Sequence, residues 1–209
     1  MSCFDGLRLV AITDLEELPG AKVVERWERL AGLAVPGRVA IDLRGPRAAA
    51  RSLLELGAAL ARVARSQQQL LIVNDRLDVA RLLAADALHL REDSVTSGEA
   101  RQFCPGVPIL RACHRPADVA LVDADAVLLS PILAARKGNA ALGVEALREA
   151  RARLDAQAGS VRLFALGGID AAGAPNCIDA GAHGVAAIGA ALGAESPRDL
   201  LQALRIARS

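Results

Sequence analysis

Aromatic residues are scarce in this chain of 209 residues, which has three phenylalanines, one tryptophan and no tyrosine. Proteins that bind single-stranded nucleic acid stack bases on aromatic side chains, and proteins that hold duplexes by charge need an excess of lysine and arginine. The 25 basic and 24 acidic residues leave a formal net charge of only +1. We therefore expect no nucleic-acid partner.

Long apolar runs are also missing, since none approaches the ~20 residues of a membrane span. The first residues, MSCFDGLRLV, show no basic segment before a long apolar one, as a signal peptide would. We expect a cytoplasmic protein with no membrane partner. The four cysteines lie far apart and form no CxxC pair, which predicts reduced thiols and neither disulfides nor a cysteine metal site.

What the chain does have is a repeated alternation of short aliphatic runs and amphipathic segments. The runs predict strands at residues 7–13, 38–43, 70–74, 87–90, 109–113, 126–129, 163–166 and 184–188. Helices are expected at residues 22–33, 47–65, 77–83, 97–103, 116–122, 144–154, 171–180 and 197–207. Eight such units, each long enough for a right-handed parallel crossover, predict a single (β/α)8 TIM-barrel domain over residues 1–209.

An open doubly wound sheet is the competing architecture. It would place a glycine-rich phosphate-binding turn after the first strand. Residues 13–16 there read TDLE, without a glycine. The barrel is therefore the favoured fold.

Polar residues stand where the predicted strands end. The strand at 70–74 ends in Asn74, Asp75 and Arg76, and the next strand is followed by Arg91, Glu92 and Asp93. A helix cap needs one Asp or Asn, not three, and the carboxyl ends of barrel strands form the rim at which ligands bind. We expect a ligand site at this rim, to which other strand ends contribute Arg44, His114 and Ser130.

Glycines follow the last two strands. Gly167 and Gly168 come after the seventh strand, and Gly189 follows Ile188 at the end of the eighth. Glycine lets backbone N–H groups approach an anion closely, and these two loops are the usual phosphate site of the fold. We predict phosphate binding at Gly167, Gly168, Ile188 and Gly189, the alternative being that the glycines only make tight turns.

Charged residues elsewhere on the rim suit a diphosphate. Asp75 and Asp93 could hold Mg²⁺, which takes few protein carboxylates together with substrate phosphates. Arg44 and Lys137 are placed to meet the diphosphate itself.

Seven stretches, in this order and spacing, resemble the thiamin-phosphate-synthase and thiazole-tautomerase (TenI-like) family over nearly the whole chain. They are residues 11–14 (AITD), 42–44 (DLR), 74–80 (NDRLDVA), 87–90 (ALHL), 130–133 (SPIL), 165–169 (ALGGI) and 180–186 (AGAHGVA). The resemblance implies the same barrel fold and a small phosphorylated heterocycle as the ligand. It leaves a homo-oligomer open.

The resemblance implies two reactions. A synthase of this family joins a pyrimidine diphosphate to a thiazole phosphate with Mg²⁺ and releases pyrophosphate. This chain departs from its pattern: Pro46 stands in place of a lysine, residues 133–137 (LAARK) lack two threonines, Ala112 replaces a serine, and Ser94 falls where the second acidic residue is expected. Loss of one well-placed donor can cost about 10²–10³ in rate, so these changes weaken the synthase interpretation.

The tautomerase branch moves a proton within a thiazole phosphate and needs a phosphate site and a positioned acid or base, without a cofactor. It carries a histidine where this chain has His114, and histidine titrates near neutrality. We therefore favour a TenI-like tautomerase with His114 as the catalytic residue. Thiamin-phosphate synthase and a non-catalytic precursor-binding module are the alternatives. His89 and His183 are interpreted as structural.

Overall fold

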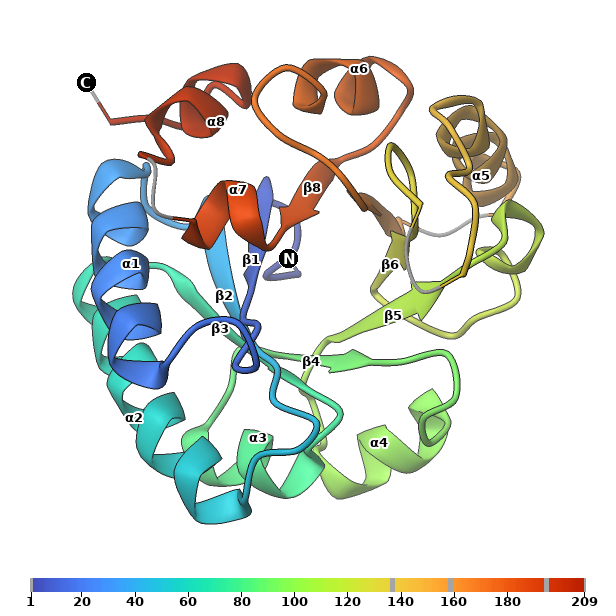
Figure 1. Ribbon diagram of the computed structural model, residues 1–209. Coiled ribbons are helices and arrows are strands. Elements are labelled where there is room, and N and C mark those ends of the chain that lie inside the picture. The colour runs from blue at the N-terminus through green and yellow to red at the C-terminus, as the bar shows by residue number, and fades with distance from the viewer. Residues whose placement is uncertain (1, 136–137, 158–159, 194–195, 209) are drawn as a thin grey trace.

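Eight parallel strands close into a barrel in sequence order, β1 to β8, and each pairs with its neighbours in the chain (Figure 1). The structure is a computed structural model, and it describes residues 2–135, 138–157, 160–193 and 196–208. The strands are β1 (Leu9–Ile12), β2 (Val39–Leu43), β3 (Leu70–Asn74), β4 (Ala87–Leu90), β5 (Ile109–Cys113), β6 (Ala126–Leu129), β7 (Arg162–Leu166) and β8 (Gly184–Ala187).

Helices surround the barrel. They are α1 (Gly20–Leu33), α2 (Ala50–Ser66), α3 (Leu77–Leu83), α4 (Ser97–Phe103), α5 (Glu145–Asp155), α6 (Ala174–Asp179), α7 (Gly189–Leu192) and α8 (Arg198–Ala203). The predicted (β/α)8 barrel is thus confirmed. In the described residues no helix is long and apolar enough to cross a membrane.

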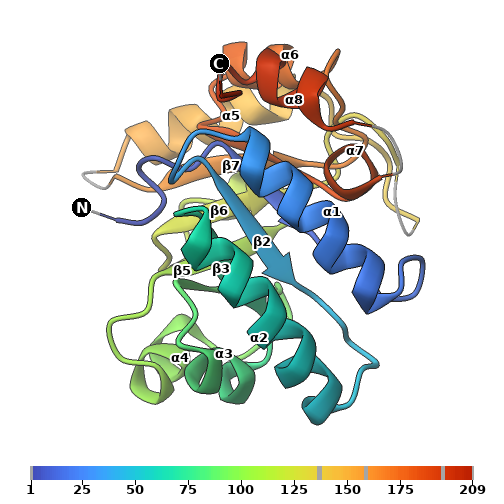
Figure 2. The same cartoon turned by 90° about the vertical axis from the view of Figure 1, so that its left-hand side faces the viewer.

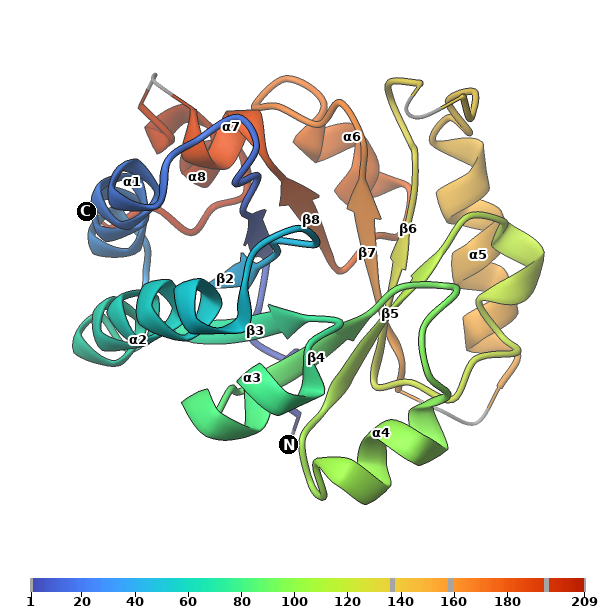
Figure 3. The same ribbon diagram turned by 60° about the horizontal axis from the view of Figure 1, so that its bottom comes forward.

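Two connections differ from the prediction. The helix expected at 116–122 is only a 3-10 turn, Pro116–Asp118, and α5 packs beside it (Figure 3). The short helix α7 was not predicted, because its four residues, GAAL, are too few to show a periodic pattern.

The strands alternate between two apolar clusters. On β1, Val10 and Ile12 point into the barrel, while Leu9 and Ala11 pack against the helices. The same alternation runs round the barrel, since successive side chains of a strand face opposite sides. The inner cluster fills the barrel toward the end at which the strands begin, so a ligand would enter from the other end.

The N-terminal segment closes the end of the barrel at which the strands begin (Figure 2). Phe4 and Leu7 are fully buried members of the inner cluster, and the Phe4 ring meets Phe164 edge to face at 6.2 Å between centroids. α7 lies at the opposite end, where the strands finish (Figure 2). The open end of the barrel is therefore the end that carries the polar residues.

His183 lies at the closed end, between the N-terminal segment and β8. Its Nε2 is 3.0 Å from the Phe4 carbonyl oxygen, and Nη1 of Arg8 lies 2.5 Å from Nε2 and 3.0 Å from Nδ1. A carbonyl can only accept, so with the proton on Nε2 the ring donates to Phe4 and accepts from Arg8 at Nδ1. Burial, together with the positive charges of Arg8 and Arg162, lowers the pKa of His183 to about 4. The structural role predicted for His183 agrees with these contacts.

This lowered pKa makes stability depend on pH. The stabilising contribution of His183 is complete above pH 6.5 and is lost as the pH falls toward about 4, because the unfolded chain takes up a proton that the folded imidazole does not. In urea unfolding at several pH values, the stability difference between the wild type and His183→Asn should be constant above pH 7. It should shrink below pH 6.5, by roughly 1–2 kcal/mol after allowance for solvent screening. A difference that does not vary with pH would contradict the assignment.

Candidate functional site

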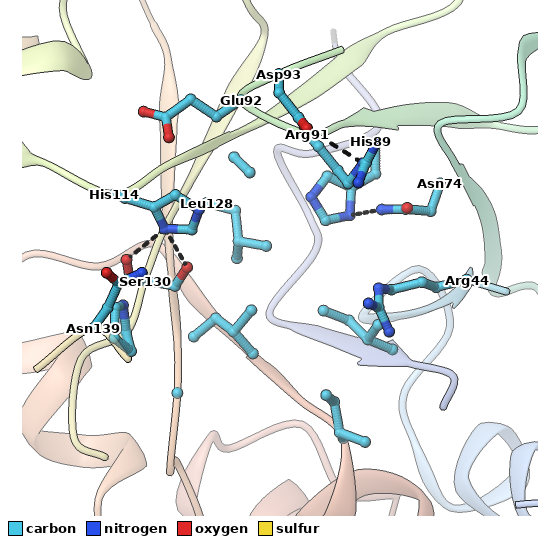
Figure 4. Close-up of a pocket in the computed structure, with 16 residues that line it drawn as sticks. Arg44, Asn74, His89, Arg91, Glu92, Asp93, His114, Leu128, Ser130 and Asn139 are labelled. Carbon is cyan, nitrogen blue, oxygen red and sulfur yellow. Dashed lines mark hydrogen bonds and ion pairs between the residues drawn. The ribbon is translucent and has the colours of Figure 1, made fainter. Parts of the chain in front are cut away.

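A cavity of about 440 Å³ opens at the carboxyl ends of the strands (Figure 4). Strand alternation explains its lining: the position two residues after the last inward side chain of a strand points into it. Its polar lining residues include Arg44, Asn74, Arg91, Asp93, His114 and Ser130. The structure thus brings together residues from five strand ends that the sequence analysis placed on one rim.

A second cavity of about 310 Å³ lies at the ends of β7 and β8. It is lined by Gly167, Gly168, Ile188 and Gly189, the four residues predicted to bind phosphate. Leu166, Gly167 and Ile188 line both cavities. The two spaces therefore adjoin.

The glycines of the smaller cavity are fixed by both conformation and packing. Gly167 and Gly168 have φ of +114° and +69°. A Cβ on Gly168 would lie 2.4 Å from Cβ of Ala134 and 2.9 Å from its nitrogen. Among the described residues, no hydrogen bond uses the N–H of Gly168 or Gly189. The tight-turn interpretation accounts for the backbone angles, while the unused N–H groups leave donors for an anion.

His114 is oriented by the end of β6. Its Nδ1 lies 2.9 Å from the Ser130 carbonyl oxygen and 3.2 Å from Ser130 Oγ. A carbonyl can only accept, so Nδ1 carries the proton and Nε2 is the nitrogen left for a ligand. Cys113 is buried on the helix side of the strand, and burial raises the pKa of its thiol to about 11. Cys113 and His114 therefore do not form a nucleophile–base pair.

Arg44 faces the cavity from the end of β2. Its backbone is held by Thr13, whose Oγ1 donates to the Arg44 carbonyl at 2.8 Å and accepts from its N–H at 2.8 Å. No ion pair or side-chain hydrogen bond joins its guanidinium to another described residue. Arg44 therefore keeps its charge available for an anionic ligand.

A buried polar network supports Asn74. Nδ1 of His89 lies 2.6 Å from Oδ2 of Asp42 and 2.9 Å from Nδ2 of Asn74, and Asp42 is fully buried. Nδ1 cannot donate to the carboxylate and also accept from an NH2 group, so with Nδ1 protonated the Asn74 amide must present its oxygen to it. The hydrogen-bonded barrel histidine predicted for His89 matches this arrangement.

Asp75 and Asp93, the predicted Mg²⁺ ligands, meet an arginine. Asp75 Oδ1 accepts from the Arg91 backbone N–H at 3.2 Å, and its Oδ2 pairs with Nε of Arg91. Asp93 Oδ1 is 3.6 Å from the same Nε. Burial would raise the pKa of Asp75, but hydrogen bonds from the side chains of Ser94 and Arg91 hold it below its ordinary value.

These residues do not fit a resident Mg²⁺ ion. Both carboxylates pair with the guanidinium of Arg91, so an ion bound to them would have to compete with a fixed positive charge. Asp75 is also not among the residues that line the larger cavity, whereas Asp93 is. Lys137, predicted to meet the diphosphate, lies outside the described residues.

Sequence reasoning gave no role to several residues at the site. Arg91, Glu92 and Asn139 line the larger cavity, and Asp42 anchors the network beneath it. The sequence analysis placed Arg91 and Glu92 on the rim without a binding role, although Arg91 stands two positions after the inward-facing His89. Asn139 comes from the long loop after β6, where no period exists to place it.

A model of the family described as thiamine monophosphate synthase matches residues 9–191. The chain belongs to the thiamine monophosphate synthase family. A thiamine-phosphate synthase of Methanoculleus marisnigri is 36% identical over 195 residues, covering 90% of this chain and 89% of that protein. Another, of Thermus thermophilus, is 31% identical over 192 residues, covering 90% and 91%.

Solved structures agree with this family in fold. The thiamine phosphate pyrophosphorylase of Pyrococcus furiosus superposes with a TM-score of 0.81 at 24% identity, over 97% of both chains. A 3-hexulose-6-phosphate synthase also shares the fold, with a TM-score of 0.63 at 20% identity over 96% of this chain and 98% of that one. The family resemblance proposed from the sequence is confirmed.

Gly168→Ala tests the phosphate site of this family member. The new methyl group would meet Ala134 and strain a backbone at φ +69°, so affinity for inorganic phosphate, measured by calorimetry, should fall about tenfold or more. Gly106→Ala is the matched control. Gly106 has φ +78° but nothing within 4 Å of a new Cβ, so this variant should lose a similar ~1 kcal/mol of stability to backbone strain and keep its phosphate affinity. Equal phosphate binding by both variants would speak against the site.

Proposed function

We propose that this protein is a thiamin-phosphate synthase, which joins a pyrimidine diphosphate to a thiazole phosphate and releases pyrophosphate. The observation that carries the proposal is the pair of adjoining cavities. The smaller one offers free backbone N–H groups to a phosphate, and the larger one is lined by two arginines. Two phosphorylated substrates need two such spaces in contact. The similarity to proteins named thiamine-phosphate synthase supports the same reaction.

The reaction needs alignment and charge stabilisation more than proton transfer. The bond between the pyrimidine methylene carbon and the diphosphate oxygen breaks, the pyrophosphate keeps the electron pair, and the thiazole nitrogen forms the new carbon–nitrogen bond. Positive charge near the leaving oxygens lowers this barrier. In the proposal, Arg44 and Arg91 face the diphosphate, and the N–H groups of Gly168 and Gly189 hold the thiazole phosphate.

Two further polar groups would orient the substrates. Asn74 is held at the floor of the larger cavity by His89. His114 presents Nε2 from the opposite side, since Ser130 holds its Nδ1 (Figure 4). Both would act on neutral parts of the bound heterocycles, for which a fixed hydrogen-bonding direction matters more than charge.

The sequence favoured a tautomerase, and the comparisons give that reaction no specific support. They favour the synthase, which was the alternative. The oriented His114 is the one observation that still suits a tautomerase. Proton transfer within a single thiazole phosphate would, however, leave most of the larger cavity without a function.

Turnover by the purified protein decides between these reactions. With the pyrimidine diphosphate and the thiazole phosphate supplied together, we expect thiamin phosphate and one equivalent of pyrophosphate. Isomerisation of a carboxythiazole phosphate supplied alone would identify the tautomerase. Binding of thiazole phosphate with no product in either assay would identify the non-catalytic module.

Arg44→Ala tests the charge of the larger cavity. Removing a guanidinium that faces the leaving diphosphate should lower kcat/KM for thiamin phosphate formation by about 10- to 100-fold. Arg47→Ala is the control, because Arg47 is three residues away, 85% exposed and paired with Glu16. It should behave as the wild type. A similar loss in both variants would mean that Arg44 acts only on stability.

A further inference from the structure

Arg91 stands at the place where the acidic residues of the rim meet. It follows β4 directly, and strand alternation from His89 turns its side chain toward the cavity that it lines. Its neighbour Asp93 also lines the cavity, and Figure 4 shows the two side chains together at the rim. The positive charge beside the acidic residues of the rim is therefore the guanidinium of Arg91.

Both carboxylate oxygens of Asp75 are used by Arg91. One accepts from the Arg91 backbone N–H and the other from its Nε. Asp75 has a φ of +57°, a left-handed conformation at which the extended strand that ends at Asn74 stops. Its carboxylate meets the guanidinium from the side and does not line the cavity. The pair thus holds the guanidinium through its Nε, while Arg91 itself lines the cavity.

A divalent cation could bind these carboxylates only by displacing Arg91. An ion at Asp75 would lie within contact distance of a fixed positive charge, and Mg²⁺ also tolerates little departure from octahedral geometry. Meanwhile, no hydrogen bond within the described part of the chain uses the Nη atoms of Arg91. Those nitrogens are donors in the planar fork that suits phosphate oxygens.

We propose that Arg91, positioned by Asp75, binds the diphosphate directly and takes the place of a divalent metal ion at this site. The inference rests on the proposed function for the identity of the ligand. The guanidinium moves no proton, since it stays charged at any working pH. It stabilises the electron pair that the departing pyrophosphate carries away.

Two binding measurements without turnover test the proposal. Mn²⁺ titrated into the wild type should show no protein-bound signal by electron paramagnetic resonance. Inorganic pyrophosphate should bind in EDTA, as measured by calorimetry. Its affinity should equal that measured in Mg²⁺, once the pyrophosphate that Mg²⁺ binds in solution is subtracted from the free concentration. Arg91→Ala should weaken pyrophosphate binding in EDTA by about 10- to 100-fold and should gain a Mn²⁺ site, because it frees Asp75 and Asp93.

Arg101→Ala is the matched control. Arg101 also lies between two aspartates, Asp123 and Asp125, but outside the cavity. It should leave pyrophosphate binding unchanged, because neither Arg101 nor its aspartates line the cavity. Arg91→Lys keeps the charge without the fork and should retain more affinity than Arg91→Ala. Circular dichroism confirms that each variant is folded, which the 52% exposure of Arg91 favours.

Three results would overturn the inference: Mn²⁺ binding by the wild type that Asp75→Asn abolishes, pyrophosphate affinity within twofold of wild type in Arg91→Ala, or no gain of Mn²⁺ binding in Arg91→Ala.

Failure of the proposed function would give different results. If neither substrate pair gives thiamin phosphate but Arg91 still controls pyrophosphate binding, the anion site stands and the reaction is another one. If thiamin phosphate forms with Mg²⁺ and Arg91→Ala is fully active, the synthase stands and Arg91 has no part in it.

Discussion

The alternation of side chains along eight parallel strands is the constraint on which this structure depends. Because every second residue points into the barrel, each strand has one series of inward side chains, and on β2 to β6 this series begins apolar and ends polar at the cavity. On β4 the series reads Ala87, His89 and Arg91: a core residue, a hydrogen-bonded histidine and a cavity-lining arginine. The series of β2 and β3 follow the same order, through Ala40 to Arg44 and through Ile72 to Asn74. Core and site residues therefore follow one another along the same strands. Phe4 and Leu7 close the end at which the strands begin, so ligands bind at the end where the strands finish.

This is why the sequence predicted the barrel and much of the rim. Periodic runs reveal strands, strand order follows from short crossovers, and the first polar residue after each strand falls at the rim, as His114 and Ser130 do. What the sequence could not supply was pairing across strands. Asp42 and His89 are 47 positions apart, and they meet because β3 lies between their strands in a register that sets Asp42 beside Ile72 and Asn74 beside His89. Until that register is known, a carboxylate at the end of a strand could equally be a helix cap, a metal ligand or the hydrogen-bond partner of another side chain.

Asp75 shows the limit most clearly. Its place after β3 suggested a metal ligand at the rim. Strand alternation alone would turn Asp75 away from the cavity, because its neighbour Asn74 points inward. The left-handed backbone at Asp75, with φ at +57°, breaks the alternation, and the carboxylate pairs with Arg91. Aspartate adopts this conformation more readily than most residues, but nothing in the local sequence requires it. The missing lysine at Pro46 was likewise weighed as a loss of positive charge, whereas the end of β4, two strands away from β2, brings Arg91 to the larger cavity.

The two carboxylates around Arg91 differ in what they contribute, and their exposure decides this. Asp75 is 18% exposed and engages the arginine twice, so its interaction is little screened and fixes the direction of the guanidinium. Asp93 is 76% exposed and 3.6 Å away, the geometry of a surface pair that adds little to stability. An arginine held by one partly buried partner keeps most of its donors and pays little rotamer entropy when a ligand arrives. A flexible surface lysine would have to be ordered by the ligand itself, which is the physical reason to expect the fixed cation at the site where charge develops.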